Sequence, residues 1–511
     1  MTISSHQREG HDAITPIPAA VPARDLELVP IPLQPTKNKG TDPFLVAFNT
    51  PHDPLNPRDW PTSRKWAVTD VLSATGFNRI MVSTIMAPAL STIAKEFDMN
   101  SAESAMALSI YLLATAFGPL VIGPLSEVYG RKPILHASNI WFLVWNMVCG
   151  FANSKEVLIA SRFLAGFGAS AIYALASGVL GDVWRPEQRG RSLGVYLLIP
   201  LLGAAVGPII GGFMAARTTW RWMFWATSIF QAAMILVSAT VFKETYEPAI
   251  LRARAKQLRR ETNDARYHTA DEHPQGLKSA IATISRALTR PLRLLAFHPI
   301  IQITAVLEAL SYGTLYIVLS TFSDLWVKQY NQSVEISGLH YIACAGGEVI
   351  GSQICARVMD GYYRRRQTLS STSPNPMIPE HRLPPLIPGT LLAPLGLILY
   401  GFTAQAKLHW AIVDAGMVIA MAGMQWAGMP IQAYVIDAYP SHVSSATAAT
   451  QFLRSLTAFL FPLFAPRMYE VMGYGWGNGF VAGVGMLFGV LGPLVLWVWG
   501  EGLRGRAGRI L

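Results

Sequence analysis

The sequence predicts an all-α membrane protein with about twelve transmembrane helices, arranged as two pseudo-symmetric bundles of six. The first observation is composition, because only 14% of the 511 residues are charged, whereas soluble proteins carry about 25%. The second is that apolar runs of about 20 residues recur, each long enough to cross about 30 Å of hydrocarbon. Since backbone polar groups find no water there, such runs are expected to be helices. The third is a long basic stretch that divides the runs six and six.

The apolar runs define the expected spans and the domain boundaries around them. The spans lie at 66–90, 104–125, 134–152, 157–180, 192–214, 221–242, 299–323, 337–358, 387–405, 410–436, 444–466 and 478–499. The sequence predicts a polar, proline-rich disordered tail at 1–60, a first bundle at 61–242, a linker at 243–298, a second bundle at 299–500 and a tail at 501–511.

Basic residues concentrate in one alternating set of loops and so predict the orientation. That set contains Arg131, Lys132, Arg185, Arg189, Arg191, the stretch from Lys243 to Arg293, Arg364 to Arg366, Arg504, Arg506 and Arg509. The other set contains Lys95, Lys155, Arg217, Lys328 and Lys407. The positive-inside rule places the first set, and with it both termini, in the cytoplasm. The net charge of +10 is therefore attributed to contact with anionic lipid and not with nucleic acid.

The linker is expected to contain a helix that lies on the inner leaflet. Its apolar residues at helical spacing are Leu277, Ile281, Ile284 and Leu288, and the basic residues among them are Lys278, Arg286, Arg290 and Arg293. An apolar stripe with basic flanks is typical of an interfacial amphipathic helix. A solvated linker is the alternative.

A turn after the second span combines glycines with charges. It reads Gly123-Pro124-Leu125-Ser126-Glu127-Val128-Tyr129-Gly130-Arg131-Lys132-Pro133. Gly123 and Gly130 permit close helix approach and a tight turn. The charges of Glu127, Arg131 and Lys132 can form contacts that exist in one conformation and break in another.

Glycine also recurs in the fourth and fifth spans. The fourth span carries Arg162 about one turn inside the membrane, followed by a face of glycine and alanine. The fifth span contains Gly203, Gly207, Pro208, Gly211 and Gly212. Glycine at every fourth position lets helices touch backbone to backbone, and the proline is expected to bend the helix.

These three segments resemble the major facilitator superfamily, in its motif between helices 2 and 3, its helix-4 arginine motif and its helix-5 antiporter motif. Glu127 and Val128 stand where aspartate and a base are usual, and this form resembles a fungal branch of twelve-span drug:proton antiporters. The resemblance covers nearly everything from 53 to 500 and extends to Arg454 in span 11. It implies the major facilitator fold, a central cavity lined by helices 1, 4, 7 and 10, alternating access, and an architectural or gating role for Arg454.

Ionisable residues inside the hydrocarbon are costly, so each is a functional candidate. Near the middle of span 1, Arg79 shares a stripe with Thr75, Gly76 and Ser83. In span 7, Glu308 shares a stripe with Thr304, Ser311 and Tyr312. Since spans 1 and 7 correspond in the two halves, we expect Arg79 and Glu308 to face each other across the cavity. A fixed ion pair that stabilises one state is the alternative.

An unpaired arginine in a cavity favours an anionic substrate, because its planar fork bonds both oxygens of a carboxylate. Arg79 therefore predicts a small organic acid such as itaconate, or an acidic secondary metabolite. Glu308 is expected to bind and release the coupling proton. Arg162 matches the helix-4 arginine that the family associates with proton coupling, and a packing role is the alternative.

Three further polar residues are candidates. Glu348 and His340, two turns apart on one face of span 8, form a second candidate proton relay, with a helix–helix hydrogen bond as the alternative. Gln425 in span 10 is expected to line the cavity, although its methionine-rich surroundings are also typical of adaptable packing.

The expected function is proton-coupled export of a small-molecule substrate by a monomer in the plasma membrane, powered by the proton gradient without a cofactor or metal. The alternatives are a multidrug, polyamine or toxin efflux pump of broad specificity, and a facilitator or importer with the same fold. A membrane enzyme is disfavoured, because the sequence contains no nucleophile with an adjacent base, no phosphate loop and no metal-ligand cluster.

Overall fold

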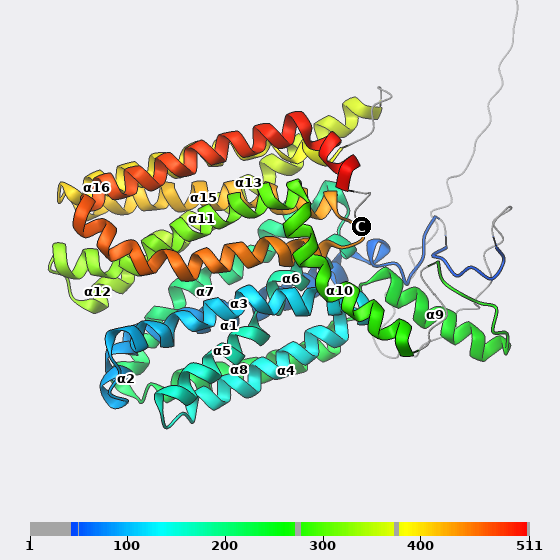
Figure 1. Cartoon of the computed structure of the whole chain (residues 1–511), viewed down its shortest axis with the longest axis horizontal. Coiled ribbons are helices and arrows are strands. Elements are labelled where there is room, and N and C mark those ends of the chain that lie inside the picture. Colours follow the sequence, from blue (N-terminus) through cyan, green and yellow to red (C-terminus); the bar gives the residue numbers. More distant parts are fainter. Residues whose placement is uncertain (1–41, 50, 271–276, 372–377, 508–511) are drawn as a thin grey trace, which may run out of the picture.

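The long helices of the computed structural model run side by side in two groups, one from each half of the chain (Figure 1). The structure describes residues 42–49, 51–270, 277–371 and 378–507. The first half contains α1 (Thr62–Thr84), α2 (Leu90–Glu96), α3 (Ser101–Tyr129), α4 (Arg131–Gly150), α5 (Lys155–Ala169), α6 (Ala171–Val183), α7 (Arg189–Arg217) and α8 (Arg221–Val241). The second half contains α11 (Pro299–Asp324), α12 (Val334–Leu339), α13 (Tyr341–Ser371), α14 (Ile387–Gln405), α15 (Trp410–Ala438) and α16 (Val443–Ala507).

Short helical turns connect these elements. They are η1 (Pro57–Asp59), η2 (Ala87–Ala89), η3 (Pro186–Gln188), η4 (Leu325–Gln329), η5 (Pro379–Arg382) and η6 (Pro384–Leu386). Each expected span coincides with a helical segment, so the all-α, two-bundle fold class is confirmed. Span 4 is divided between α5 and α6, whereas α16 contains both of the last two spans. These part at Gly473, whose φ of 71° lies outside the helical region and suits a residue without Cβ.

By length and composition alone, eight stretches of the described chain qualify as membrane spans. The last of them, Val443–Arg504, includes both spans of α16. The helices α1, α4 and α13 do not qualify. Two of these three carry intramembrane charges that the sequence singled out, Arg79 in α1 and Glu348 in α13, whereas Glu308 and Arg162 lie in stretches that qualify.

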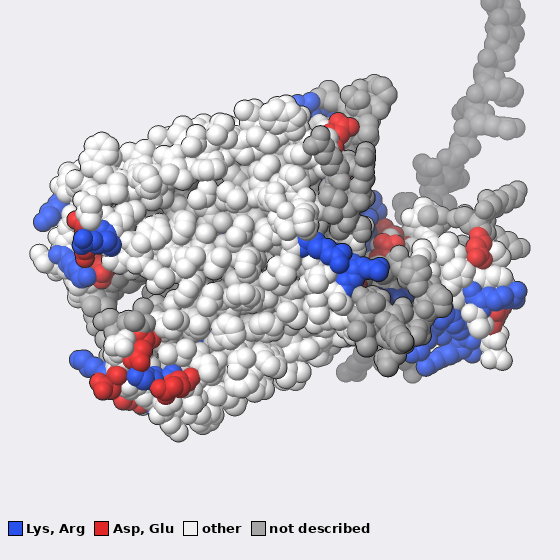
Figure 2. Space-filling model, in the orientation of Figure 1, with Lys and Arg blue, Asp and Glu red and all other residues white. Residues whose placement is uncertain are grey.

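Charged side chains gather at two opposite ends of the molecule, and a broad face between them is almost free of charge (Figure 2). Large apolar side chains are exposed on this chain, such as Leu236 at 71% and Leu395 at 61%. Such a surface is suited to hydrocarbon and not to water. We call the end where α9 and α10 lie the linker end, and the opposite end the far end (Figure 1).

The linker contains two helices, α9 (Glu247–Thr262) and α10 (Leu277–Phe297). The helix expected at this place is α10, whereas α9 was not predicted. The α10 side chain Leu294 is fully buried in an apolar cluster with residues of the second half. Leu292 and Phe297 are 50% and 61% exposed. The helix thus packs on the protein with one face and leaves apolar side chains exposed, and its contact with a membrane stays a prediction.

The predicted disordered tail at 1–60 needs a correction in its last part, while residues 1–41 lie outside the described residues. Asp53 is only 1% exposed and accepts hydrogen bonds from the backbone N–H of Asn49 (2.8 Å) and of Leu55 (2.9 Å). It also forms an ion pair of 2.8 Å with Arg254 of α9. Burial by itself raises the pKa of Asp53, but these donors outweigh burial and hold the pKa below its usual value. The segment before α1 is therefore docked on α9.

Apolar packing joins the two halves at the linker end. One buried cluster there contains Leu175 and Leu193 of the first half together with Cys355 and Met429 of the second. Toward the far end, the buried clusters belong to single halves, such as those around Phe224 and around Met417. In the described residues, the shared apolar core thus lies on the linker side of the molecule.

Candidate functional site

A cavity of about 1520 Å³, part of it open to solvent, lies between the two halves. Its walls come from α1, α6 and α7 of the first half and from α11, α13, α15 and α16 of the second. These include the four expected spans, 1, 4, 7 and 10, together with spans 5, 8 and 11. The polar side chains of the wall are Thr84, Ser177, Glu308, Ser311, Glu348, Gln425, Gln432, Thr447, Gln451 and Arg454.

The charges of the wall form one cluster inside the second half, made of Glu308 on α11, Glu348 on α13 and Arg454 on α16. Both glutamates are only 8% exposed and lie within electrostatic range of Arg454. Glu308 also hydrogen-bonds with Thr450, and the Arg454 guanidinium lies 4.0 Å from the ring centroid of Tyr312. The cluster thus combines two buried carboxylates with one partly exposed cation.

Aromatic side chains form much of the remaining wall. The tyrosines are Tyr173, Tyr196, Tyr312, Tyr316 and Tyr341. The rings of Tyr312 and Tyr316 meet edge to face, with their centroids 5.1 Å apart. Met424, Met429 and Gln425 of α15 line the same space. Rings and thioethers of this kind contact flat or irregular apolar ligands well.

The predicted meeting of Arg79 and Glu308 across the cavity is wrong. Arg79 is 2% exposed and is absent from the cavity wall. Its guanidinium donates to the carbonyl oxygen of Ala169 (2.9 Å) and to the side-chain oxygen of Asn139, and it lies 5.7 Å from the ring centroid of Phe142. Arg79 therefore joins helices inside the first half, and the cation beside Glu308 is Arg454.

The prediction failed because the side of α1 that faces the cavity is offset by one residue from Arg79. The α1 residues that line the cavity are Gly76, Ile80 and Thr84. Successive residues of a helix differ in direction by about 100°, so the neighbouring stripe of Arg79 points into the bundle. The hydroxyls of Thr75 and Ser83 donate to carbonyl oxygens of α1 itself, at 2.8 Å and 2.6 Å, and neither residue lines the cavity.

Arg162 is fully buried in the first half and does not line the cavity. It donates to the carbonyl oxygens of Val82 (2.9 Å) and of Ala107 (3.4 Å). Its guanidinium also lies 4.8 Å from the ring centroid of Tyr111 and 5.9 Å from that of Phe224. These contacts join α1, α3, α5 and α8, and a part in proton coupling stays a prediction.

The predicted pairing of His340 with Glu348 is also wrong. His340 lies just before α13, where its ring stacks on Trp326 with centroids 3.7 Å apart. Its Nδ1 lies 2.6 Å from the carboxylate of Asp414, and its Nε2 lies 2.9 Å from Gln332. His340 thus belongs to a cluster toward the far end, whereas Glu348 lines the central cavity.

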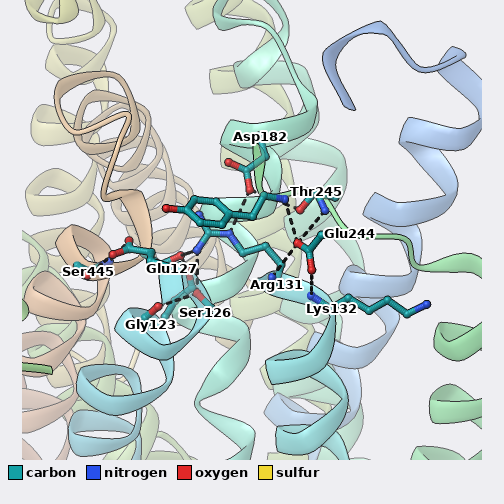
Figure 3. A network of polar contacts seen from close by, with 12 residues as sticks. Gly123, Ser126, Glu127, Arg131, Lys132, Asp182, Glu244, Thr245 and Ser445 are labelled. Carbon is teal, nitrogen blue, oxygen red and sulfur yellow. Dashed lines mark hydrogen bonds and ion pairs between the residues drawn. The ribbon is translucent and has the colours of Figure 1, made fainter. Parts of the chain in front are cut away.

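The charged turn between α3 and α4 builds a network at the linker end (Figure 3). Arg131 is 1% exposed and pairs with Asp182 at the end of α6 (3.1 Å). It also donates to Ser126 (2.7 Å) and, across the halves, to Ser444 of α16 (2.8 Å). Glu244 accepts from the backbone N–H groups of Arg131 and Lys132, at 2.8 Å and 3.1 Å, and so caps α4.

The carboxylate of Glu127 crosses directly to the second half. It accepts from the backbone N–H of Ser445 at the start of α16 (2.8 Å) and from the hydroxyl of the same residue (2.5 Å). Arg290 of α10 donates to Glu127 as well, at 3.0 Å, and lies 3.2 Å from the ring nitrogen of His442. Gly123 faces the carbonyl oxygen of Ser444, which an added Cβ would approach to 2.8 Å. The predicted close approach at Gly123 is therefore present.

A matching contact runs in the other direction. Asp360 of α13 accepts from the backbone N–H groups of Gly190 and Arg191 at the start of α7, both at 2.8 Å. Beside it, Asp437 of α15 pairs with Arg189 of α7 and with Arg382, the latter at 2.8 Å. Two carboxylates thus bond the first turn of a helix in the opposite half.

The glycines of α7 lie where α7 crosses α1. An added Cβ would approach the carbonyl oxygen of Phe77 to 2.7 Å at Gly203 and that of Met81 to 2.8 Å at Gly207. The carbonyl oxygen of Ile85 lies closer still at Gly211. Pro208 lies inside this helix, and Gly212 is in ordinary contact with Pro88. The predicted backbone-to-backbone packing is confirmed.

A cavity between two six-helix halves, with two glutamates and an arginine in its wall, is typical of a membrane transport protein. The sequence matches the Major Facilitator Superfamily over residues 72–462, and the chain belongs to this superfamily of transporters. The Aspergillus flavus protein named probable efflux pump mfs2 is 56% identical over 422 residues, 83% of this chain and 99% of its own length. Efflux pump vrtL of Penicillium aethiopicum is 38% identical over 464 residues, 91% of each chain.

Solved structures of the same superfamily share the fold. The proton:xylose symporter XylE covers 86% of this chain and 96% of its own, with a TM-score of 0.63 at 16% identity. The human organic anion transporter MFSD10 covers 85% of this chain and 100% of its own, with a TM-score of 0.61 at 15% identity. At this level of identity the likeness concerns the fold and not the substrate.

Proposed function

We propose that the chain exports a small-molecule substrate in exchange for protons, by exposing the central cavity to the two membrane faces in turn. The observation that carries the proposal is the cluster of Glu308, Glu348 and Arg454 in the cavity between the halves. Relatives named as efflux pumps support export as the direction. The proton gradient supplies the energy, so the cycle needs no cofactor. The proposed setting is the plasma membrane, with a monomeric protein whose linker end and termini face the cytoplasm.

Glu308 and Glu348 are the proposed proton carriers. An ionised carboxylate within the hydrocarbon is costly unless a cation accompanies it. Each glutamate can avoid this cost in two ways. It can pair with Arg454 when it is ionised, or it can bind a proton and become neutral. Alternation between these two states allows the cavity to take up a proton on one side of the membrane and release it on the other.

The charge of the cluster bears on the substrate. The sequence predicted an acidic substrate because of Arg79. Since Arg454 is the cation of the cavity wall, this prediction now depends on Arg454. With both glutamates ionised, two negative charges face one positive charge, and the remaining negative charge repels an anion. A small organic acid, itaconate-like or a secondary metabolite, would therefore bind together with a proton, and the two would move in the same direction.

A neutral or cationic aromatic substrate fits proton exchange better. It can hydrogen-bond to the same carboxylates that the proton occupies, so substrate and proton exclude each other. The tyrosine-lined wall and its methionines favour aromatic ligands, and tyrosine faces attract cations. We therefore propose broad-specificity efflux of such compounds as the first candidate. The second candidate is export of an organic acid together with a proton, driven by the outward concentration gradient of the acid and not by the proton gradient.

Transport by the reconstituted protein tests the proposal. In proteoliposomes, a pH gradient is expected to drive ethidium, an aromatic cation, against the direction of proton flow, whereas itaconate would move with the protons. Glu308→Gln combined with Glu348→Gln is expected to abolish gradient-driven transport and to retain exchange of labelled for unlabelled substrate, because it removes both proposed proton sites and keeps the shape of the cavity.

The control is Glu470→Gln, the same change at a side chain that is 66% exposed and pairs with Arg467. Its transport should equal that of the unchanged protein. Transport of ethidium that persists undiminished after the pH gradient is collapsed would contradict proton exchange.

A further inference from the structure

A second cavity of about 650 Å³, part of it open to solvent, lies inside the second half, among α11, α14, α15 and the last span of α16. We call it the side pocket. Its wall is mainly apolar, with residues such as Leu397, Ile431 and Phe488. The hydroxyls of Thr314 and Thr390 also line it, but they donate to carbonyl oxygens of their own helices, both at 2.8 Å. The side pocket therefore offers few free polar groups to a ligand.

The side pocket adjoins the central cavity. Glu308, Ser311, Met424 and Gly428 line both spaces. At Gly428 an added Cβ would meet nothing within 4 Å, so the space beside this glycine is open. The two cavities thus meet between α11 and α15, and the carboxylate of Glu308 lies at their junction.

The outer wall of the side pocket reaches the apolar surface. Phe488 lines the side pocket and is 43% exposed. Gly485, one turn earlier on α16, also lines it, and a Cβ there would meet nothing within 4 Å. The side pocket therefore extends from the charge cluster toward the surface that faces hydrocarbon.

We propose that the side pocket holds the apolar chain or ring of the exported substrate while its polar head lies at Glu308 and Arg454. The substrate class is then an amphiphile and not a compact polar molecule. The inference deepens the proposed function and rests on it. The mainly apolar wall rejects a charged head group, whereas each methylene buried there tightens binding about fourfold. The junction at Glu308 fits the point where head and chain meet.

Photolabelling of the complete protein in lipid nanodiscs tests this placement. The probes are ten-carbon chains that carry either a carboxylate or an ammonium head, each made with a diazirine at the chain end or beside the head. The chain-end diazirine is expected to label 427–431 and 481–489, and the diazirine beside the head is expected to label the peptide that contains Arg454. A probe that enters as a lipid from the bilayer would keep its head outside the protein. The diazirine beside the head would then label the surface and not the peptide that contains Arg454.

A matched pair of substitutions narrows the test. Gly485→Leu fills the side pocket, whereas Gly483→Leu adds the same side chain at an exposed glycine nearby in the same helix, where a Cβ also meets nothing within 4 Å. Gly485→Leu is expected to raise the half-saturating concentration of the ten-carbon probe at least tenfold and to leave that of a two-carbon analogue unchanged. Gly483→Leu is expected to change neither. Partition into the bilayer is the same for both proteins and cancels in the comparison.

The outcomes separate this inference from the proposed function. Labelling of the side pocket by the chain end together with a chain-length effect confined to Gly485→Leu supports the inference, even if pH-gradient transport fails. The inference is overturned if neither the carboxylate nor the ammonium probe labels the side pocket, or if only the surface is labelled. It is also overturned if Gly485→Leu and Gly483→Leu have equal effects. Proton-driven transport of ethidium would in that case still support the proposed function.

Discussion

Arg79 and Arg162 are intramembrane arginines that serve as links between helices. A guanidinium has five N–H donors, and in both residues carbonyl oxygens of neighbouring helices accept from it. Each guanidinium also lies near an aromatic ring, Phe142 for Arg79 and Tyr111 for Arg162. Such a residue keeps its charge in hydrocarbon because the helices around it replace water.

Arg79→Ala is accordingly expected to impair folding more than transport. The change leaves the carbonyl of Ala169 and the side chain of Asn139 without their donor and opens a void, which costs about 2–4 kcal/mol. Thermal unfolding of the purified protein should show a lower midpoint, and the folded fraction should keep the substrate preference of the unchanged protein.

The control for Arg79→Ala is Thr84→Ala, which removes a polar side chain of the cavity wall on the same helix. It should unfold like the unchanged protein, within about 0.5 kcal/mol, because its hydroxyl bonds only within α1. If the Arg79→Ala protein were fully stable but no longer transported its substrate, Arg79 would have to act on the substrate in the cavity.

At the residue scale, the sequence indicated which helices carry charge but not the direction of each side chain. A stripe at helical spacing is at least about 100° wide, so Arg79 and Ile80 could not be separated without the neighbouring helices. The sequence placed Glu308 correctly on the cavity wall, because the stripe chosen on span 7 is the one that faces the cavity. The motif around Arg454 led to an architectural or gating role for this residue, although an arginine in mid-span is itself a signal of a functional site.

At the scale of elements, the turn between α3 and α4 depends on one glycine. Gly130 has φ +102°, and an added Cβ would approach the carboxylate oxygen Oε2 of Glu244 to 2.5 Å. This carboxylate caps the first turn of α4. Gly130 therefore allows the backbone to turn and the cap to approach at the same time.

Gly130→Ala is expected to destabilise the protein by about 2–3 kcal/mol, through backbone strain and the displaced cap. The matched control is Gly361→Ala in α13, where a Cβ meets nothing within 4 Å and the helix should gain about 0.5–1 kcal/mol. Unfolding midpoints of both variants, measured in the same detergent, give the comparison. Equal midpoints would show that the turn tolerates a side chain.

The elements outside the membrane were harder to predict than the spans. The sequence predicted α10 because an apolar stripe marks it, but α9 has no such stripe and many charges, which is also typical of a solvated linker. The docked segment before α1 depends on the contact between Asp53 and Arg254, which lie far apart in the chain. A contact of this kind leaves no periodic signal in the sequence.

At the scale of the whole molecule, composition and the recurrence of apolar runs were sufficient to predict two bundles of six spans. The charged turn predicted contacts that can break, but not their partners. In the structure, such contacts cross between the halves in both directions, from Glu127 and Arg131 to the start of α16 and from Asp360 to the start of α7. Both crossings lie at the linker end, beside the apolar core that the halves share.

Under the proposed alternating access, these crossings hold the linker end closed, and their loss should open it. A hydrogen bond to a charged group contributes about 1.5–3 kcal/mol, so neutralising both carboxylates removes at least about 3 kcal/mol from the closed state. Glu127→Gln combined with Asp360→Asn is therefore expected to shift the equilibrium between the closed and open linker end by about 100-fold or more.

Spin labels at Ser63 of α1 and Arg365 of α13, both exposed at the linker end and in opposite halves, can report this shift as a distance distribution. The unchanged protein should give one short distance, and the double variant should add a longer one. Asp324→Asn is the control, because this carboxylate pairs with Lys328 on the surface of the far end and crosses no interface. A double variant that keeps the short distance alone would mean that the remaining contacts, and not the two carboxylates, hold the halves together at the linker end.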